Sequence, residues 1–393
     1  MNNKTENKIR LLRVINSYDA LGGLQIFVRA LDQRMIDDGK VDVHAIYFTN
    51  DKEEKNRVDK VGVKRYPIYK EETKGHTTPF NSWYSFLKKL NRTIKEEDID
   101  IVQVNYPYYA RAAWSSILVS KLFNRKPTIL THHGDFMNLG NPVREYILRS
   151  IFNLADAKVG VCKTSAMAAG SGSKKNKDAL DISSFVDYDF FDPKKGNGNP
   201  LKDSTNGEHL FIYPARIVPA KGQEDLVDAV RIAQERYGNN FSVVIVGSTE
   251  DKKFEQYLKE KINKLDLKDR VTIHSPVSQE KLRDIYSEST LIIPSHREGL
   301  PLVLLEALSM ERPVITTRVG GVTEVIEHGE NGVLVEPRNP ESLAEGIGFI
   351  LQQNPEKLRD FGRKGRKIVT QRYSLDKVVE NHYRLYEQVL RKN

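Results

Sequence analysis

At positions 295–307 the chain reads Ser295-His296-Arg297-Glu298-Gly299-Leu300-Pro301-Leu302-Val303-Leu304-Leu305-Glu306-Ala307, which is the most informative part of the sequence. It follows an apolar run at 291–294 that is typical of a buried strand, and its Gly-Leu-Pro turn opens an apolar helix. A buried strand that passes through a tight turn into a helix is the repeating unit of a parallel α/β sheet covered on both faces.

Two glutamates of this stretch, Glu298 and Glu306, have seven residues between them. The turn projects Glu298 above the helix N-terminus, and Glu306 follows on the same side of the helix, because positions a whole number of turns apart share a face. The helix start between them offers free backbone N–H groups and the positive end of the helix dipole, which suit a phosphate. Two carboxylates that accept hydrogen bonds from hydroxyls, one on each side of an anion site, indicate a ligand with sugar at both ends and a diphosphate in the middle. Such a ligand is a nucleotide sugar.

The same alternation of strand and helix runs through the whole chain. Apolar runs predict strands at 9–15, 41–48, 61–68, 99–104, 128–131 and 158–162, and again at 209–214, 241–246, 271–275, 290–294, 313–317 and 332–335. Helical periodicity fills several of the intervals, as at 24–37, 83–94, 223–237 and 253–265. The predicted fold class is α/β, with two doubly wound Rossmann-like domains facing across a cleft.

A polar segment rich in Gly, Lys and Asn at 192–200 is typical of a linker between the two halves. We therefore expect an N-terminal Rossmann-like domain at 1–190 and a C-terminal, nucleotide-sugar-binding one at 191–374. Residues 375–393 are predicted to form a helix that could pack back on the N-terminal domain. Its expected apolar face contains Val378, Val379, Tyr383, Tyr386 and Leu390.

The composition is that of a soluble globular protein, because 39% of the 393 residues are hydrophobic and 29% are charged. No apolar run approaches the roughly 20 residues that span a bilayer, and the N-terminus has no apolar signal core, so we expect a cytoplasmic protein. The single cysteine, Cys162, is predicted to be an inert core thiol. Residues 1–190 carry +7 of the net charge of +8, which fits an acidic acceptor, an anionic membrane surface or simply a solvated surface. Dense interleaving of basic and aromatic residues is absent, so no nucleic-acid partner is expected.

Taken together, these features resemble the large family of retaining, nucleotide-sugar-dependent glycosyltransferases with the GT-B fold (group 1, or family 4). The resemblance covers nearly the whole chain and is most specific at Glu298 to Glu306, followed by Gly320-Gly321 and Glu324. It implies that Glu298 holds a hydroxyl of the donor hexose and that Glu306 holds the nucleotide ribose. It also implies that the N-terminal domain shapes the acceptor site.

A second motif, Pro214-Ala215-Arg216-Ile217-Val218-Pro219-Ala220-Lys221-Gly222, places two cations in a loop between a strand and a helix. An arginine fork and a lysine point charge suit a phosphate. The resemblance implies that Arg216 and Lys221 hold the donor diphosphate and stabilise the departing charge. The alternative is a surface loop with two solvated cations.

Two weaker motifs lie in the first half. Gly22-Gly23 follows the first strand, where glycine lets the backbone approach a ligand closely, and the resemblance places this loop near the transferred sugar. His133, in Leu130-Thr131-His132-His133-Gly134-Asp135, is the histidine that the resemblance places beside that sugar. Only one of the two adjacent histidines is expected to line the site, with His132 as the alternative, because neighbours on a strand point to opposite faces. Asp135 is a candidate acceptor contact.

The chain departs from the family pattern at two places. Ser275 stands where the family usually has glycine, in the loop that leads to Val277 and normally lies along the nucleobase, so the base stays open. The sequence Ser184-Phe185-Val186-Asp187 stands where Asn-Gly-Val-Asp is common.

The predicted catalytic residues are His133, Glu298, Arg216 and Lys221, and the predicted donor-binding residues are Gly22, Gly23, Gly299, Leu300, Pro301, Leu302, Glu306 and Val277. No metal ligand and no cofactor are predicted, because Asp-x-Asp is missing from these motifs and two cations can replace a metal.

The expected activity is the transfer of a hexose-type sugar from a nucleoside-diphosphate sugar to an acceptor hydroxyl with retention, in cell-surface polysaccharide or glycolipid synthesis. The acceptor is predicted to be a glycan, a lipid-linked molecule or a small molecule. Two alternatives are a nucleotide-sugar epimerase on the same scaffold and a non-catalytic nucleotide-sugar-binding partner. The basic, amphipathic stretch 83–92 fits either a helix packed on the N-terminal sheet or peripheral contact with the inner membrane surface.

Overall fold

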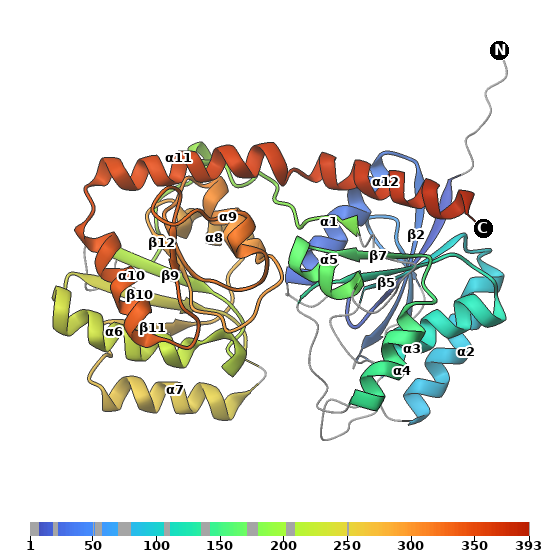
Figure 1. The fold of residues 1–393 in the computed structure, drawn as a ribbon, viewed down its shortest axis with the longest axis horizontal. Coiled ribbons are helices and arrows are strands. Elements are labelled where there is room, and N and C mark those ends of the chain that lie inside the picture. The colour runs from blue at the N-terminus through green and yellow to red at the C-terminus, as the bar shows by residue number, and fades with distance from the viewer. Residues whose placement is uncertain are drawn as a thin grey trace, which may run out of the picture. The chain divides into compact units, whose positions relative to one another are not determined.

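The computed structural model describes residues 8–18, 23–49, 51, 57–69, 80–105, 111–134, 142–170, 180–201, 209–249 and 251–392. The chain divides into two units (Figure 1). Unit 1 comprises Met1–Ser183 together with Asp376–Asn393, and unit 2 comprises Ser184–Leu375.

Unit 1 is built on an eight-stranded sheet. Its strands are β1 (Ile9–Ile15), β2 (Val41–Thr49), β3 (Arg57–Val58), β4 (Lys64–Tyr69), β5 (Ile101–Asn105), β6 (Thr128–His132), β7 (Ala157–Gly160) and β8 (Leu180–Asp181). They lie in the order β3-β4-β2-β1-β5-β6-β7-β8, and every pairing is parallel except that of β3 with β4. The strand order reverses between β1 and β5, so the loops after these strands leave the sheet on either side of a switch point, where ligands bind in such sheets.

Helices cover both faces of this sheet. They are α1 (Gly23–Asp37), α2 (Phe80–Glu96), α3 (Arg111–Leu118) with its π-helical extension η1 (Val119–Phe123), α4 (Pro142–Phe152), α5 (Lys163–Gly170) and, from the far end of the chain, α12 (Leu375–Arg391). On α2, Phe86 and Leu90 are fully buried, and Trp83 and Leu87 pack against the same core. The apolar face of the basic stretch 83–92 is therefore used inside unit 1.

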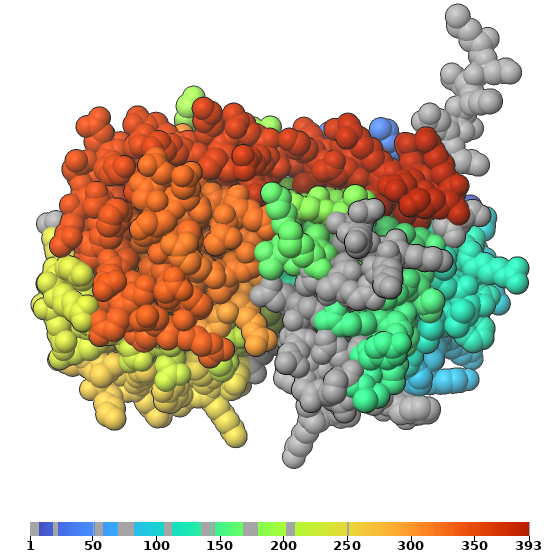
Figure 2. All heavy atoms as spheres, viewed as in Figure 1, coloured from blue at the N-terminus to red at the C-terminus, as the bar shows by residue number. Residues whose placement is uncertain are grey.

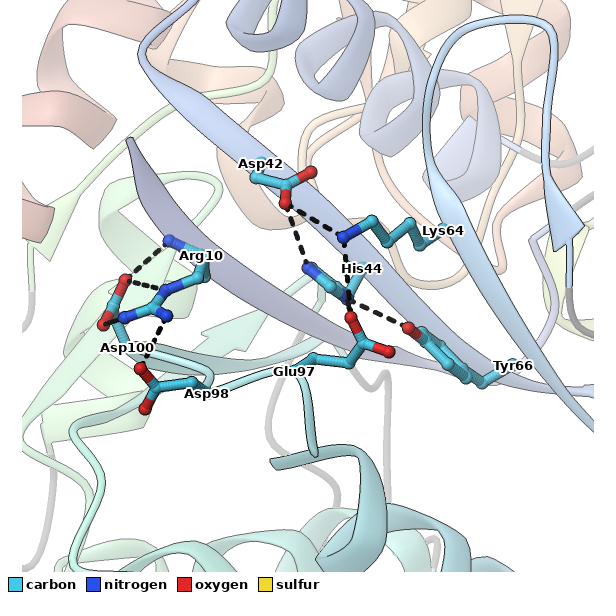
Figure 3. A network of polar contacts seen from close by, with 8 residues as sticks. All are labelled: Arg10, Asp42, His44, Lys64, Tyr66, Glu97, Asp98 and Asp100. Atoms are coloured by element: carbon cyan, nitrogen blue, oxygen red, sulfur yellow. Dashed lines mark hydrogen bonds and ion pairs between the residues drawn. The ribbon is translucent and has the colours of Figure 1, made fainter. Parts of the chain in front are cut away.

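A network of polar side chains lies at the amino-terminal edge of the sheet in unit 1 (Figure 3). Arg10 at the start of β1 donates to Asp100 just before β5, with Nη2 2.9 Å from Oδ1. Lys64 at the start of β4 lies 3.3 Å from Asp42 and 3.5 Å from Glu97. His44 of β2 belongs to the same network and is fully buried, and this burial lowers its pKa. These contacts join the beginnings of four strands at the edge opposite to the loops that carry the predicted site.

Helix α12 belongs to unit 1 although it is last in the sequence, and Figure 2 shows its red surface laid over that unit. Its buried residues are Val378, Val379, His382, Leu385, Tyr386 and Val389. Arg34 of α1 pairs with Asp376, and the Tyr386 hydroxyl donates to Gln103 Oε1 of β5 at 2.7 Å. The helix therefore both covers apolar surface and completes the polar interior of unit 1.

Unit 2 is built on a six-stranded, all-parallel sheet. Its strands are β9 (His209–Pro214), β10 (Phe241–Val246), β11 (Val271–His274), β12 (Thr290–Ile293), β13 (Val314–Thr317) and β14 (Val333–Val335). They lie in the order β11-β10-β9-β12-β13-β14, which is the strand order of the doubly wound dinucleotide-binding fold. The order reverses between β9 and β12, which pair through Phe211 and Ile212 with Thr290 and Leu291.

The helices of unit 2 are α6 (Gln223–Tyr237), α7 (Lys252–Lys264), α8 (Gln279–Tyr286), α9 (Leu302–Ser309), α10 (Pro340–Gln352) and α11 (Pro355–Arg372), with short 3₁₀ turns η2 (Pro193–Lys195), η4 (Pro219–Lys221) and η5 (Gly320–Glu324). The polar segment 192–200 lies within this unit, where the Asn197 backbone N–H donates to Asp284 Oδ1 at 3.2 Å.

The predicted α/β class with two doubly wound sheets is confirmed. The strands expected at 9–15, 209–214 and 241–246 begin and end where they were predicted. The sequence did not reveal the short antiparallel β3 or the π-helical η1. Among the described residues, no helix is long and apolar enough to cross a membrane.

Candidate functional site

The loops after β9 and β12 meet at the switch point of unit 2. The first loop carries Lys221 at the end of η4, and the second carries Glu298 between β12 and α9. Lys221 Nζ lies 2.5 Å from Glu298 Oε1, as an ion pair whose side chains are 23% and 11% exposed. Two motifs that are 77 residues apart in the sequence thus form one site.

Two glycines allow the backbones of these loops to approach each other. Gly222 has a φ of +68°, and a Cβ at this position would lie 2.1 Å from the Pro294 carbonyl oxygen. Gly320, at a φ of +53°, would place a Cβ 2.1 Å from the Glu298 carbonyl oxygen. Both distances are far below van der Waals contact and both φ values disfavour side chains, so glycine is required at each position.

Two buried hydroxyls support the Lys221–Glu298 pair. Ser295 Oγ donates to Glu298 Oε1 at 2.6 Å, and it lies 2.9 Å from the Tyr213 hydroxyl. Tyr213 also donates to the Lys221 carbonyl oxygen at 2.8 Å. Sequence reasoning gave neither residue a role. The signal that was available is the position of each, since Ser295 lies two residues after the end of β12 and Tyr213 is the penultimate residue of β9.

The start of α9 has the features of an anion site. Its N-cap residue is Pro301, and no side chain caps the first turn. Just before it, the Gly299 carbonyl accepts from the Gly321 N–H at 2.6 Å, and the Leu300 carbonyl accepts from Ser184 Oγ at 3.3 Å. These bonds fix the turn, while the first N–H groups of the helix, at Leu302 and Val303, point out of it with the positive end of the dipole; the Leu304 N–H is bonded to the Pro301 carbonyl at 3.2 Å.

Glu306 is held in α9 in an apolar environment. Its carboxyl is only 6% exposed, and burial raises its pKa to about 7. Its Oε2 accepts from the Tyr286 hydroxyl at 3.3 Å. A carboxyl that titrates near neutrality is unusual outside functional sites.

The other two predicted residues of unit 2 lie in loops that follow β9 and β11, at the carboxyl-terminal edge of the same sheet. Arg216 is exposed in the loop after β9, and its carbonyl accepts from Gln223 Nε2 at 2.8 Å. Val277 is half-buried in the loop after β11, directly before Ser278, which caps the N-terminus of α8.

In unit 1, the two adjacent histidines diverge as predicted from strand geometry. The His133 ring meets Phe27 of α1 edge-on at 5.8 Å between ring centroids, and its Nε2 lies 3.3 Å from Asn105 Oδ1. The His132 ring instead packs edge-on against Phe152 of α4, at 6.4 Å between centroids. Burial lowers the pKa of His133 to about 3 and that of His132 to about 4, so both are neutral at physiological pH.

Gly23 is the first residue of α1, the helix whose Phe27 touches His133. Unit 1 thus brings together the helix that follows the glycine pair and the loop that carries the histidine. Gly22 and Asp135 lie outside the described residues. His133 and Gly23 belong to unit 1, whereas the Lys221–Glu298 centre belongs to unit 2.

Two families match this chain. The family described as Glycosyl transferases group 1 matches residues 201–368, and the one described as Glycosyltransferase Family 4 matches residues 21–170. Together they contain every predicted site residue, with one family on each half of the chain.

Individual relatives agree with these matches. An uncharacterized glycosyltransferase of Methanocaldococcus jannaschii is 26% identical over 385 residues, which are 95% of this chain and 96% of the relative. The capsular polysaccharide biosynthesis glycosyltransferase CapM of Staphylococcus aureus is 29% identical over 194 residues, which are 48% of each chain. Among solved structures, Anabaena HepE in complex with UDP and glucose superposes with a TM-score of 0.75 at 16% identity, over 97% of this chain and 100% of HepE. At this identity the last comparison supports the fold alone.

Proposed function

Since the chain belongs to the group 1 and family 4 glycosyltransferases, we propose that it transfers a hexose-type sugar from a nucleoside-diphosphate sugar to an acceptor hydroxyl with retention at the anomeric carbon. The observation that supports this most directly is the Lys221–Glu298 contact beside the uncapped start of α9. A cation, a carboxylate and a helix N-terminus gathered at the switch point of a doubly wound sheet suit a sugar joined to a diphosphate.

The donor would be held from both ends. Glu298 accepts a hydrogen bond from a hydroxyl of the transferred sugar, and Glu306 accepts from the ribose. The diphosphate lies between them, against Arg216, Lys221 and the N–H groups at the start of α9. The ammonium of Lys221 has three N–H donors, so it can bind a phosphate oxygen without leaving Glu298.

In the reaction, the bond from the anomeric carbon to the β-phosphate oxygen breaks, and its electron pair stays with the phosphate. The acceptor oxygen forms a bond to the same face of that carbon, and its proton passes to the departing phosphate oxygen. Arg216, Lys221 and the backbone of residues 299–302 stabilise the charge that grows on the leaving group, which is where preorganised groups contribute most to the rate. No protein base and no metal ion are needed in this scheme.

His133 and the glycine loop before α1 would contact the transferred sugar. A histidine whose pKa is lowered to about 3 by burial stays neutral, so it can accept or donate a hydrogen bond without adding a positive charge to an oxocarbenium-like transition state. The glycines at 22 and 23 would leave room for the sugar ring.

For the acceptor, we propose a growing cell-surface polysaccharide or a glycolipid, on the cytoplasmic side of the membrane, with a small-molecule acceptor as the alternative. The likeness to a capsular polysaccharide enzyme supports the first choice. Peripheral contact with an anionic membrane would use a surface other than the apolar face of α2, because that face is packed in the core.

The test is donor hydrolysis by the purified protein across UDP-, GDP- and ADP-sugars, with EDTA present. We expect slow release of one nucleoside diphosphate, which Glu298→Ala or Lys221→Ala lowers by at least 100-fold. Glu341→Ala, which breaks only a surface ion pair with Arg236, is the matched control and should keep wild-type turnover.

Three outcomes would contradict the proposal. Release that requires a divalent cation would remove the metal-independent scheme. Conversion of the donor to another nucleotide sugar without release of nucleoside diphosphate would indicate an epimerase. Wild-type turnover in both site variants would show that the chemistry lies elsewhere.

A further inference from the structure

We propose that Ser295 and Tyr213 are positioning residues with separate tasks: Ser295 aims the Glu298 carboxylate at the sugar of the donor, and Tyr213 fixes the loop that carries Lys221 to the diphosphate. The inference rests on the proposed function and assigns it two further residues. It starts from one observation, which is that a single pair of touching hydroxyls contacts both functional loops.

Ser295 acts on the orientation of the carboxylate. Glu298 Oε1 receives two donors, Ser295 Oγ at 2.6 Å and Lys221 Nζ at 2.5 Å. Among the described residues, Oε2 has no hydrogen-bond partner, so one oxygen is anchored twice and the other is left for a ligand. Without Ser295 the carboxylate would be held by the flexible lysine side chain alone and could rotate about its last bond.

Tyr213 acts on the backbone of the neighbouring loop. Its hydroxyl donates to the Lys221 carbonyl oxygen at 2.8 Å, directly before Gly222, where the chain turns into α6. Tyr213 is only 1% exposed, and burial together with the charge of Glu298 raises its pKa well above the ordinary value. The hydroxyl therefore keeps its proton and remains a donor.

A count of protons separates the two tasks. Three contacts join Lys221 O, Tyr213 Oη, Ser295 Oγ and Glu298 Oε1 in a row, but the two hydroxyls carry only two protons. The carbonyl and the ionised carboxylate can only accept, so both protons are used when Tyr213 donates to Lys221 and Ser295 donates to Glu298. Each hydroxyl then serves one loop, and loss of one leaves the bond of the other intact.

The backbone around Ser295 is fixed well enough for its hydroxyl to act in this way. Its own carbonyl accepts from Thr317 Oγ1 of β13 at 2.6 Å. The next residue, His296, donates its N–H to the Ala220 carbonyl at 3.0 Å, and its ring lies 2.7 Å from Asp225. Ser295 itself is fully buried, so its hydroxyl is shielded from competing water.

The experiment compares binding of UDP, GDP and ADP with that of UDP-glucose, GDP-glucose and ADP-glucose by calorimetry, using the full chain. For the pair that the wild type binds, Ser295→Ala should weaken the sugar conjugate about tenfold and leave the free nucleoside diphosphate unchanged, because the lost bond involves a charged acceptor. Tyr213→Phe should weaken both ligands by the same factor. A merely structural role for Ser295 would also weaken both ligands together.

Ser309→Ala is the matched control, since Ser309 is equally buried in the same unit; its hydroxyl donates to the Phe191 carbonyl at 2.8 Å and accepts from Arg366 Nη1 at 3.5 Å, away from the Lys221–Glu298 pair. It should change neither affinity. In a Glu298→Ala background, Ser295→Ala should have no further effect on the sugar conjugate, because its target is gone. Thermal unfolding of each variant confirms that it folds, and Tyr213→Phe still tests the second task if Ser295→Ala does not fold.

Equal loss of both ligands in Ser295→Ala, or selective loss of the sugar conjugate in Tyr213→Phe, would overturn the assignment while leaving the proposed function in place. Failure of the wild type to bind any of the six ligands would instead remove the proposed function itself.

Discussion

Donor binding should depend on pH through Glu306, because this carboxyl is buried in α9 and its pKa is raised to about 7. A ribose hydroxyl donates best to the ionised carboxylate, so the competent fraction of the protein is the ionised fraction. That fraction is about one half at pH 7 and about one tenth at pH 6. The apparent dissociation constant scales inversely with the competent fraction. We therefore expect affinity for the nucleotide sugar to fall about tenfold from pH 8 to pH 6.

Calorimetry with a nucleotide sugar is the suitable assay, because its diphosphate lacks the second ionisation that a terminal phosphate has near pH 6. Titrations at pH 6 in buffers of different ionisation enthalpy should also show that about one proton is released on binding. Glu306→Gln should bind weakly and lose the pH dependence. A flat profile in the wild type, or an unchanged slope in Glu306→Gln, would refute the reasoning.

The raised pKa of Glu306 also affects stability, which should fall as pH rises, whereas affinity for the donor should increase. Since the folded-state pKa of Glu306 lies above its ordinary value of 4.5, the folded protein keeps a proton that the unfolded chain loses. Stability is therefore lost as pH rises from about 4.5 through 7, and the buried charge costs about 3 kcal/mol at pH 8 and above. Glu306→Gln should be more stable than the wild type in urea unfolding at pH 8 and show little gain at pH 4.

Three further predictions concern the packing that supports the site. Arg13→Met should lower the free energy of unfolding, measured in urea, by about 3–5 kcal/mol, because it leaves the fully buried carboxylate of Asp32 without its ion pair. Adding Asp32→Leu to this variant should recover most of the loss. The pKa of His382 is lowered to about 3, chiefly by burial, so its contribution to the free energy of unfolding is complete above pH 6.5 and is lost as pH falls below that value. His382→Gln should therefore remove about 2 kcal/mol of the destabilisation seen on going from pH 7 to pH 5. Gly222→Ala should lower donor hydrolysis at least tenfold, because its Cβ would collide with the Pro294 carbonyl, whereas Gly238→Ala at a similar φ, with open space around the Cβ, should leave hydrolysis unchanged.

Each of these three has an outcome that would contradict it. Equal stability of Arg13→Met and the double variant would show that the unpaired carboxylate is tolerated. An acid profile of His382→Gln that parallels the wild type would place the proton uptake elsewhere. Full activity in Gly222→Ala would show that the loop can shift without moving Lys221.

The sequence was sufficient for the parts of the fold that depend on local periodicity. Strands with mostly apolar runs, such as β9 and β10, were predicted to the residue, because strands buried on both faces of a parallel sheet read as short, nearly continuous apolar runs between polar segments. The prediction for α12 was less accurate. Leu390 was expected on the buried face and is 36% exposed, whereas Val389 is 1% exposed. An error of one residue in the phase of a helix rotates each side chain by about 100° about the helix axis. Periodicity alone does not assign the buried face more closely than this near a helix end.

The sequence was not sufficient for the support of the candidate site. Tyr213 and Ser295 touch across 82 residues, and Tyr286 reaches Glu306 across 20, so no local pattern connects them. The Tyr213–Ser295 contact follows from strand order, because β9 and β12 are neighbours at the point where the order of the strands reverses. Lys221, Glu298 and Gly222 stand out in the sequence because they are charged or glycine within a loop motif, whereas Tyr213 and Ser295, which contact them, are ordinary residues at strand ends.

The polar interior of unit 1 joins side chains of β1, β5 and β6 to α12, which is far from them in the sequence. Arg13 is fully buried in β1, and it donates to Gln103 Oε1 at 2.9 Å as well as pairing with Asp32. The same Gln103 Oε1 accepts from Tyr386 of α12, while Gln103 Nε2 donates to Thr131 at 2.8 Å, two residues before His133. The amide oxygen of Gln103 thus accepts from both ends of the sequence, so α12 contributes a hydrogen bond to the network around the buried Arg13 as well as apolar surface.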